Sequence, residues 1–242
     1  LLLQAEHAVR RVRSAIRLFD REHRDVPQSL ADELQWFART LGEARDWDVI
    51  ADQTLPSLAE GIGVDATKPL VVQADARRQQ ARENIRKAAR SARYAALVLN
   101  GERWCMTPAP AGAELLADAA APVLQRASKK LFKAARFFAA LTPARRHQVR
   151  ILAKRLRYAL DLFSVALPKQ ATARYTNALA ELQDMLGLLN DLSVAAAVLP
   201  QLTKSARIKK SVQQSSAPTE PGRVLDIEAR LLKLSKLQTP WA

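Results

Sequence analysis

Two pairs of matching blocks, arranged in the same order along the sequence, constrain the fold of this chain more than any other feature. The first pair is residues 10–19 (RRVRSAIRLF) and 154–163 (KRLRYALDLF). The second pair, reached after one inserted residue, is residues 41–49 (LGEARDWDV) and 186–194 (LGLLNDLSV). Shared order as well as shared composition indicates an internal duplication, and a duplicated chain is expected to fold as two similar halves.

Each half is expected to be helical. Hydrophobic residues make up 48% of the chain, there are only 7 glycines, and no useful stretch alternates apolar and polar residues as a strand does. Ala, Leu, Arg and Gln, which lose little on entering a helix, recur throughout. We therefore predict an all-α fold in which residues 1–106 and 107–242 form two helical bundles related by an approximate twofold axis. Gly42 and Gly187 are expected at equivalent close helix contacts.

Apolar spacing and helix-stop residues place the individual helices. Ser29 is expected to cap the second helix and Thr142 the fifth. The third is expected to run unbroken to Asn100-Gly101, and the fourth is either continuous or broken near Pro122. The predicted helices cover residues 4–24, 29–56, 71–99, 113–141, 143–166, 170–203 and 224–237, with polar loops at 107–112 and 209–222.

The charge balance indicates an anionic partner. The sequence has 38 Lys and Arg against 24 Asp and Glu, a formal net charge of +14. An excess of this size destabilises a folded chain by self-repulsion unless an anion offsets it. Nucleic acid, an anionic membrane surface and a free polyanion are the partners that such a charge suits.

Cysteine content and hydropathy bear on the cellular compartment of the protein and on whether it spans a membrane. Cys105 is the one cysteine, so the chain forms no internal disulfide and offers no cysteine-based zinc site. No apolar run reaches the roughly 18 residues that a membrane span requires, and the leading three leucines are too few for the core of a signal peptide. We expect a soluble, cytoplasmic protein that carries no cofactor and no metal ion.

One helix carries the clearest candidate site. Four basic residues at three- and four-residue spacing fall in one arc of it: His147, Arg150, Lys154 and Arg157. Apolar residues from Val149 to Phe163 gather on a nearly opposed face. We predict that the apolar face anchors this helix in the core and leaves the cationic stripe for a ligand.

Three further segments carry basic stripes. Such rows are most often solvated faces paired with Asp or Glu, but acidic partners look scarce in three of the four segments. Arg predominates, which suits phosphate because a guanidinium offers a planar fork of donors and keeps its charge. The residues predicted to bind a polyanion are Arg10, Arg11, Arg13, Arg17, Arg78, Arg82, Arg86, Lys129, Lys133, Arg136, His147, Arg150, Lys154, Arg155 and Arg157.

Several short motifs together resemble one known family. They are His147-Gln-Val-Arg150, Lys154-Arg-Leu-Arg-Tyr158 and Leu186-Gly with Asn190-Asp191, and in the first copy Leu41-Gly with Arg45-Asp-Trp-Asp48. Over nearly the whole chain this set resembles the CHAD domain, the conserved histidine α-helical domain. Members of that family are paired four-helix bundles with a basic central channel. They bind inorganic polyphosphate and can localise to polyphosphate granules, so the resemblance implies the same fold, ligand and location here.

The first copy departs from the family pattern at its N-terminal end. Leu3 stands where the family has its first histidine, and Glu6 stands where it has an arginine. His7 and Arg10 offer the same His-x-x-Arg spacing one turn later. The Glu-x-Glu-x-Lys strand motif of the triphosphatase domain that adjoins many CHAD domains does not occur in this sequence.

Two other functions compete with polyphosphate binding. Nucleic acid carries similar phosphates, but the basic stripes have few aromatic residues for base stacking and no recognition motif. An enzyme that uses His147 as a phosphorylated residue or a metal ligand is less favoured, because the chain has 3 histidines and no acidic cluster. Asp46 and Asp191 are expected to support the basic helices structurally. We predict a non-enzymatic polyphosphate-binding protein, with nucleic acid as the secondary partner and no membrane binding.

Overall fold

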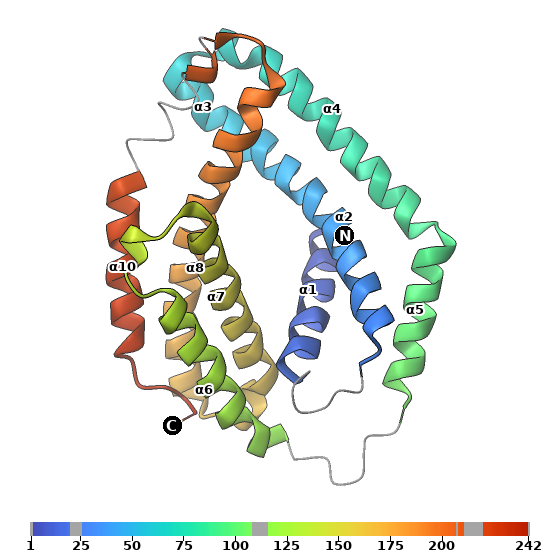
Figure 1. The fold of residues 1–242 in the computed structure, drawn as a ribbon, viewed down its shortest axis with the longest axis vertical. Helices are drawn as coiled ribbons and strands as arrows, with labels where there is room; N and C mark the ends of the chain where they lie inside the picture. Colours follow the sequence, from blue (N-terminus) through green and yellow to red (C-terminus); the bar gives the residue numbers. More distant parts are fainter. Residues whose placement is uncertain (1, 20–25, 108–115, 207, 211–219, 242) are drawn as a thin grey trace. The chain divides into compact units, whose positions relative to one another are not determined.

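The protein is described by a computed structural model as a chain of helices joined by turns (Figure 1). The all-α fold class predicted from the sequence is confirmed, and no strand occurs among the described residues. These residues are 2–19, 26–107, 116–206, 208–210 and 220–241. The chain divides into two compact units: unit 1 is residues 1–111 with 195–215, and unit 2 is residues 112–194 with 216–242.

Unit 1 is organised around α2. Its helices are α1 (Leu2–Phe19), α2 (Gln28–Val49), α3 (Leu55–Ile62), α4 (Val64–Ala89) and α5 (Ala92–Cys105). α2 packs against α1, α4 and α5, and Figure 1 shows α2 running beside α4. Leu30, Phe37 and Leu41 of α2 form a buried cluster with Leu97 of α5, and the ring centroid of Phe37 lies 4.7 Å from that of Tyr94. The apolar spacing of α2 therefore faces its neighbours, as an amphipathic helix requires.

The start of α2 differs from the prediction. Pro27 occupies the N-cap position, and no side chain caps the helix. Its carbonyl oxygen accepts hydrogen bonds from the backbone N–H groups three and four residues on, at 2.9 and 3.2 Å. Because the ring of Pro27 fixes φ near −56°, backbone geometry alone starts the helix. The predicted cap at Ser29 is wrong.

The end of the second predicted helix also differs. A single π-helical turn, Ile50–Thr54, carries α2 directly into α3, so helical structure continues past Pro56 to Ile62. Pro56 is tolerated because it falls in the first turn of α3, where its missing N–H costs little.

The third predicted helix is in fact two helices. The backbone breaks at Arg90, and Ser91 caps the helix that follows. The Ser91 hydroxyl oxygen accepts a hydrogen bond from the Tyr94 N–H at 3.1 Å, and the hydroxyl donates to the Ala88 carbonyl oxygen at 2.6 Å. α5 then runs through Gly101 instead of stopping there. The prediction of one unbroken helix is wrong, because a local cap interrupts a continuous apolar pattern.

Unit 2 packs α6 against α7. Its helices are α6 (Leu116–Ala134), α7 (Pro143–Phe163), α8 (Lys169–Val198, of which residues up to Val194 belong to this unit) and α10 (Glu220–Ser235). As predicted, Thr142 caps α7, and its side chain accepts a hydrogen bond from the Arg145 N–H. The largest fully buried side chains of unit 2 are Leu124, Leu131, Phe138, Leu156, Leu160, Phe163, Tyr175, Leu179 and Leu182.

The described part of α6 stops before the predicted end at Leu141. Phe137 adopts the left-handed conformation, with φ of 56°, and a short 3-10 turn from Phe138 to Ala140 follows. Pro122 lies inside α6, which is continuous there. The predicted loops at 107–112 and 209–222 fall largely outside the described residues.

Gly42 and Gly187 do not lie at close helix contacts. Within the described structure, a Cβ atom at either position would meet no heavy atom of a neighbouring element within 4 Å. The expectation of equivalent close contacts is wrong, and packing does not explain why either helix contains a glycine. The two four-helix bundles and their approximate twofold axis stay predictions.

One helical stretch, Lys169–Leu202, is apolar enough to cross a membrane by length and composition, with a mean hydropathy of 1.4 over its best window. No run of this length was expected from the sequence. A core helix of a globular protein passes the same test. Only 18% of that window is buried in the structure, so it does not resemble a mostly buried core helix. A single stretch of this kind is nevertheless weak evidence for a membrane span, because length and composition alone select it.

Candidate anion-binding site

The face of α7 that carries the predicted cationic stripe lies opposite a fully buried face. Val149, Leu156 and Leu160 are completely buried, whereas Arg157 is half-buried and His147 is exposed. Arg150, Lys154 and Arg155 are also half-buried on this helix. α7 is therefore anchored on one side and presents positive charge on another, as its sequence pattern predicts.

The Arg157 guanidinium is held by an uncharged amide from α8. Its Nη1 donates to Gln183 Oε1 at 3.2 Å, and Gln183 Nε2 in turn donates to the Ala153 carbonyl oxygen of α7 at 2.8 Å. Gln183 is 7% exposed, so its amide has little access to water and both of its ends are satisfied by protein. The carbonyl of Ala153 fixes which end of the amide faces Arg157.

His147 is likewise held by an amide of α8, that of Asn190, which lies seven residues after Gln183. Its Nδ1 lies 2.6 Å from Asn190 Oδ1, and Asn190 Nδ2 donates to Asp191 Oδ1 at 3.3 Å. Since a carboxylate only accepts, Asp191 orients the amide of Asn190 with its oxygen toward His147. That oxygen accepts a hydrogen bond from the Nδ1–H group, which leaves Nε2 as the ring nitrogen without this contact.

The basic stripe of α6 is also in unit 2. Lys129, Lys133 and Arg136 are exposed, and the Arg136 guanidinium lies 4.9 Å from the centroid of the Phe137 ring. These side chains are placed to meet an anion in solvent. They lack the buried hydrogen-bond partners that orient Arg157.

The predicted stripe of α4 in unit 1 is extensively paired with carboxylates. Arg78 contacts Asp52 at 2.7 Å and Asp75 at 3.3 Å, and Arg82 contacts Asp48 at 2.7 Å. Arg86 contacts Glu83 at 3.1 Å. Acidic partners are thus not scarce here, and the pairing cancels much of the charge that the α4 sequence suggested.

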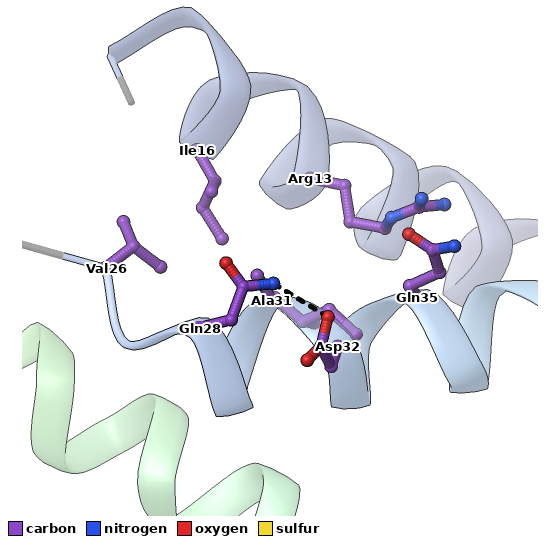
Figure 2. A pocket seen from close by; sticks show the side chains of 8 residues that line it. Arg13, Ile16, Val26, Gln28, Ala31, Asp32 and Gln35 are labelled. Atoms are coloured by element: carbon purple, nitrogen blue, oxygen red, sulfur yellow. Dashed lines mark hydrogen bonds between the residues drawn. The ribbon is translucent and has the colours of Figure 1, made fainter. Parts of the chain in front are cut away.

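The α1 stripe is partly neutralised as well. Arg10 forms an ion pair with Glu6, which is 3% exposed, while Arg11 is exposed. Arg13 lines a small hollow between α1 and the start of α2. Figure 2 shows it reaching toward Gln35. The side chain of Arg17 lies outside the described ones.

The described part of the chain contains no group of three or more His, Cys, Asp or Glu side chains placed to hold a metal ion. What the structure offers instead is two kinds of cation: those held by amides on the α7 face of unit 2, and those held by carboxylates on α1 and α4 of unit 1.

A family model described as the CHAD domain matches residues 2–200. The chain belongs to the CHAD family. Among solved structures, the CHAD domain from the plant Ricinus communis superimposes with a TM-score of 0.82 at 31% identity, covering 99% of this chain and 82% of that one. PptA from Streptomyces chartreusis superimposes with a TM-score of 0.74 at 20% identity, covering 96% of this chain and 87% of that one. No curated protein sequence matches the chain.

The sequence pattern identified the cations of this CHAD domain but not the residues that hold them. Gln183 and Asp52 were not singled out, and Asp48 was noted only within the Arg45-Asp-Trp-Asp48 motif. One signal was available in α8: Gln183 and Asn190 lie seven residues apart, on one face of the helix. Polar amides at that spacing indicate a partner on a neighbouring helix.

Proposed function

We propose that this CHAD domain binds inorganic polyphosphate through the cationic face of α7. One observation carries the proposal: α7 buries its apolar face while His147 and Arg157, on its cationic side, are held by uncharged partners. Family membership supports it, because polyphosphate binding is the activity that the CHAD resemblance implies. The basic channel implied by the same resemblance stays a prediction.

Polyphosphate suits this face because it is a chain of phosphates with no bases to accommodate. Guanidinium groups bind phosphate oxygens with paired hydrogen bonds, each worth about 1.5 to 3 kcal/mol. Several such contacts in a row give tight binding that weakens as salt rises. We extend the proposal to a non-enzymatic role in the cytoplasm, at polyphosphate granules.

Nucleic acid is the second candidate, and one observation favours it. Phe137 is 67% exposed beside Arg136, an arrangement on which an unpaired base can stack. A competition titration separates the candidates. Long-chain polyphosphate is expected to displace single-stranded DNA and RNA at equal phosphate concentration and at two salt concentrations. If single-stranded DNA or RNA instead displaces polyphosphate near physiological salt, the proposal is contradicted.

A charge reversal tests the α7 face directly. The double variant Arg150→Glu with Arg157→Glu replaces two cations by two anions and is expected to lower polyphosphate affinity at least about a hundredfold at moderate salt. Arg103→Glu with Arg174→Glu makes the same charge change at exposed positions and serves as the control. Circular dichroism checks folding, and Arg150→Gln with Arg157→Gln is the milder pair. Unchanged affinity in folded variants contradicts the site.

A further inference from the structure

The basic residues of α7 in unit 2 that have amide partners differ from the basic residues of α1 and α4 in unit 1 in how they are held. In unit 2, Arg157 donates to the amide of Gln183 and His147 bonds to the amide of Asn190. In unit 1, Arg78 and Arg82 pair with Asp52 and Asp48, and Arg10 pairs with Glu6. An amide oxygen orients a guanidinium by a hydrogen bond but adds no charge, whereas a carboxylate orients it and cancels its charge.

The amides of unit 2 come from one face of one helix. Gln183, Gly187 and Asn190 follow each other at spacings of four and three residues, so they lie along a single row of α8. Gly187, between the two amides, leaves open space where a side chain would stand. The row thus combines two acceptors, each bonded to a residue of α7, with a gap between them.

The internal duplication shows that this arrangement is not a general property of the repeat. Aligned through the LG blocks, Gln183 corresponds to Ala38 and Asn190 to Arg45. Unit 1 therefore has no amide at either position, and it has the buried Glu6 where Arg150 stands in unit 2.

We infer that Gln183 and Asn190 are positioning residues of the anion site, and that their lack of charge is what leaves the α7 face available to phosphate. This inference rests on the proposed function. Gln183 orients the guanidinium of Arg157 and Asn190 orients the ring of His147, and neither amide carries a negative charge. Arg157 accordingly keeps more of its positive charge for polyphosphate than the carboxylate-paired Arg78 and Arg82 of α4.

The test adds one negative charge without changing side-chain size. Gln183→Glu and Asn190→Asp place a carboxylate beside Arg157 and His147. Gln170→Glu makes the same change at an exposed position on the same helix and is the matched control. Gln183→Met removes the hydrogen bonds but adds no charge. Long-chain polyphosphate is titrated against each protein at about pH 5.5, where an imidazole is largely protonated, over a series of salt concentrations, and thermal unfolding is followed in parallel.

The salt dependence separates a charge effect from loss of structure. Affinity falls as salt rises, so the slope of log affinity against log salt is negative. Cancelling one phosphate-binding cation makes that slope about 0.7 less steep, which corresponds to an affinity loss of about fourfold at 0.15 M salt and about eightfold at 0.05 M. We expect this less steep slope in Gln183→Glu and Asn190→Asp. The slope of the wild type is expected to persist in Gln170→Glu and Gln183→Met.

The outcomes distinguish this inference from the proposed function. If the wild type binds polyphosphate and the folded Gln183→Glu and Asn190→Asp proteins keep its slope, the inference is overturned and the function stands. Equal losses of slope in Gln183→Met and Gln183→Glu overturn it too, because the role is then structural. If Gln183→Glu does not fold, Asn190→Asp, at a half-exposed position, decides alone. A wild type that does not bind polyphosphate overturns both.

Discussion

At the scale of single residues, some buried polar groups of unit 2 have specific partners and others have none. The Trp241 N–H donates to Gln125 at 2.9 Å, and the Trp241 ring packs edge-on against Tyr175. Tyr175 itself is fully buried, its hydroxyl has no hydrogen-bond partner among the described residues, and burial raises the pKa of its phenol, an effect that the side chain of Ser128 partly opposes. A buried phenol of this kind must stay neutral in the folded state.

Tyr175 therefore predicts how stability responds to alkaline pH. Its folded-state pKa lies above its unfolded value, so its contribution is fully present below the unfolded pKa of about 10 and is lost as pH rises through the folded pKa. Denaturant unfolding curves across this range are expected to show a steeper loss of stability for the wild type than for Tyr175→Phe, which has no phenol to ionise. Parallel curves for the two proteins contradict the assignment.

Trp241 offers a second residue-scale prediction. Trp241→Ala removes a nearly buried ring from the core of unit 2 and is expected to cost about 3 to 5 kcal/mol of unfolding free energy. Trp241→Phe keeps an aromatic ring but leaves Gln125 without its donor, and about 1 kcal/mol is expected from the lost hydrogen bond in addition to a smaller packing loss. Urea denaturation measures both, and similar costs for the two variants would show that the ring packing matters little.

At the scale of helices, local signals predicted some caps and missed others, and the partners on neighbouring helices were not predicted. Thr142 was predicted as the cap of α7, because a cap needs only the residue and the turn that follows it. The break at Ser91 was missed, since Ala, Leu and Val continue the apolar pattern through it. The cations of α7 were found from spacing alone, but their partners lie 26 and 43 residues away on α8, beyond the reach of any helical wheel. The pairing of Arg78 with Asp52 and of Arg82 with Asp48, 26 and 34 residues away, was out of reach for the same reason, whereas Asp75 and Glu83 lie three residues from their partners on α4 itself.

The Ser91 cap is testable because two helices depend on it. Ser91→Ala removes the oxygen that accepts from the Tyr94 N–H and is expected to cost about 1 kcal/mol of unfolding free energy. Ser91→Gly, which suits a cap position without a side chain, is expected to cost only a few tenths. Unfolding by urea, followed by circular dichroism, gives both values. A Ser91→Ala variant as stable as the wild type would show that the hydroxyl is not what separates α4 from α5.

At the scale of the whole molecule, internal ion pairs lower the repulsion that a net charge of +14 produces. Unit 1 offsets several of its arginines internally, through Glu6, Asp48 and Asp52. On the α7 face of unit 2, Arg157 is instead oriented by an uncharged amide, so its positive charge can be offset by an external anion. Stability and ligand binding should therefore be linked in this protein, since an anion that binds the folded state stabilises it by mass action.

This linkage gives the last prediction. Long-chain polyphosphate at about one hundred times its dissociation constant is expected to stabilise the wild type by about 2.7 kcal/mol, seen as a rise in Tm. Sulfate at matched ionic strength is the control, because simple screening also relieves repulsion among exposed charges. The difference between the two anions measures binding, and it should vanish in the Arg150→Glu with Arg157→Glu variant. The difference should persist in Asp48→Asn, which removes the carboxylate paired with Arg82, because Arg82 lies on the α4 stripe and not on the α7 face. Equal stabilisation by sulfate and polyphosphate would mean that the excess charge is screened and not bound.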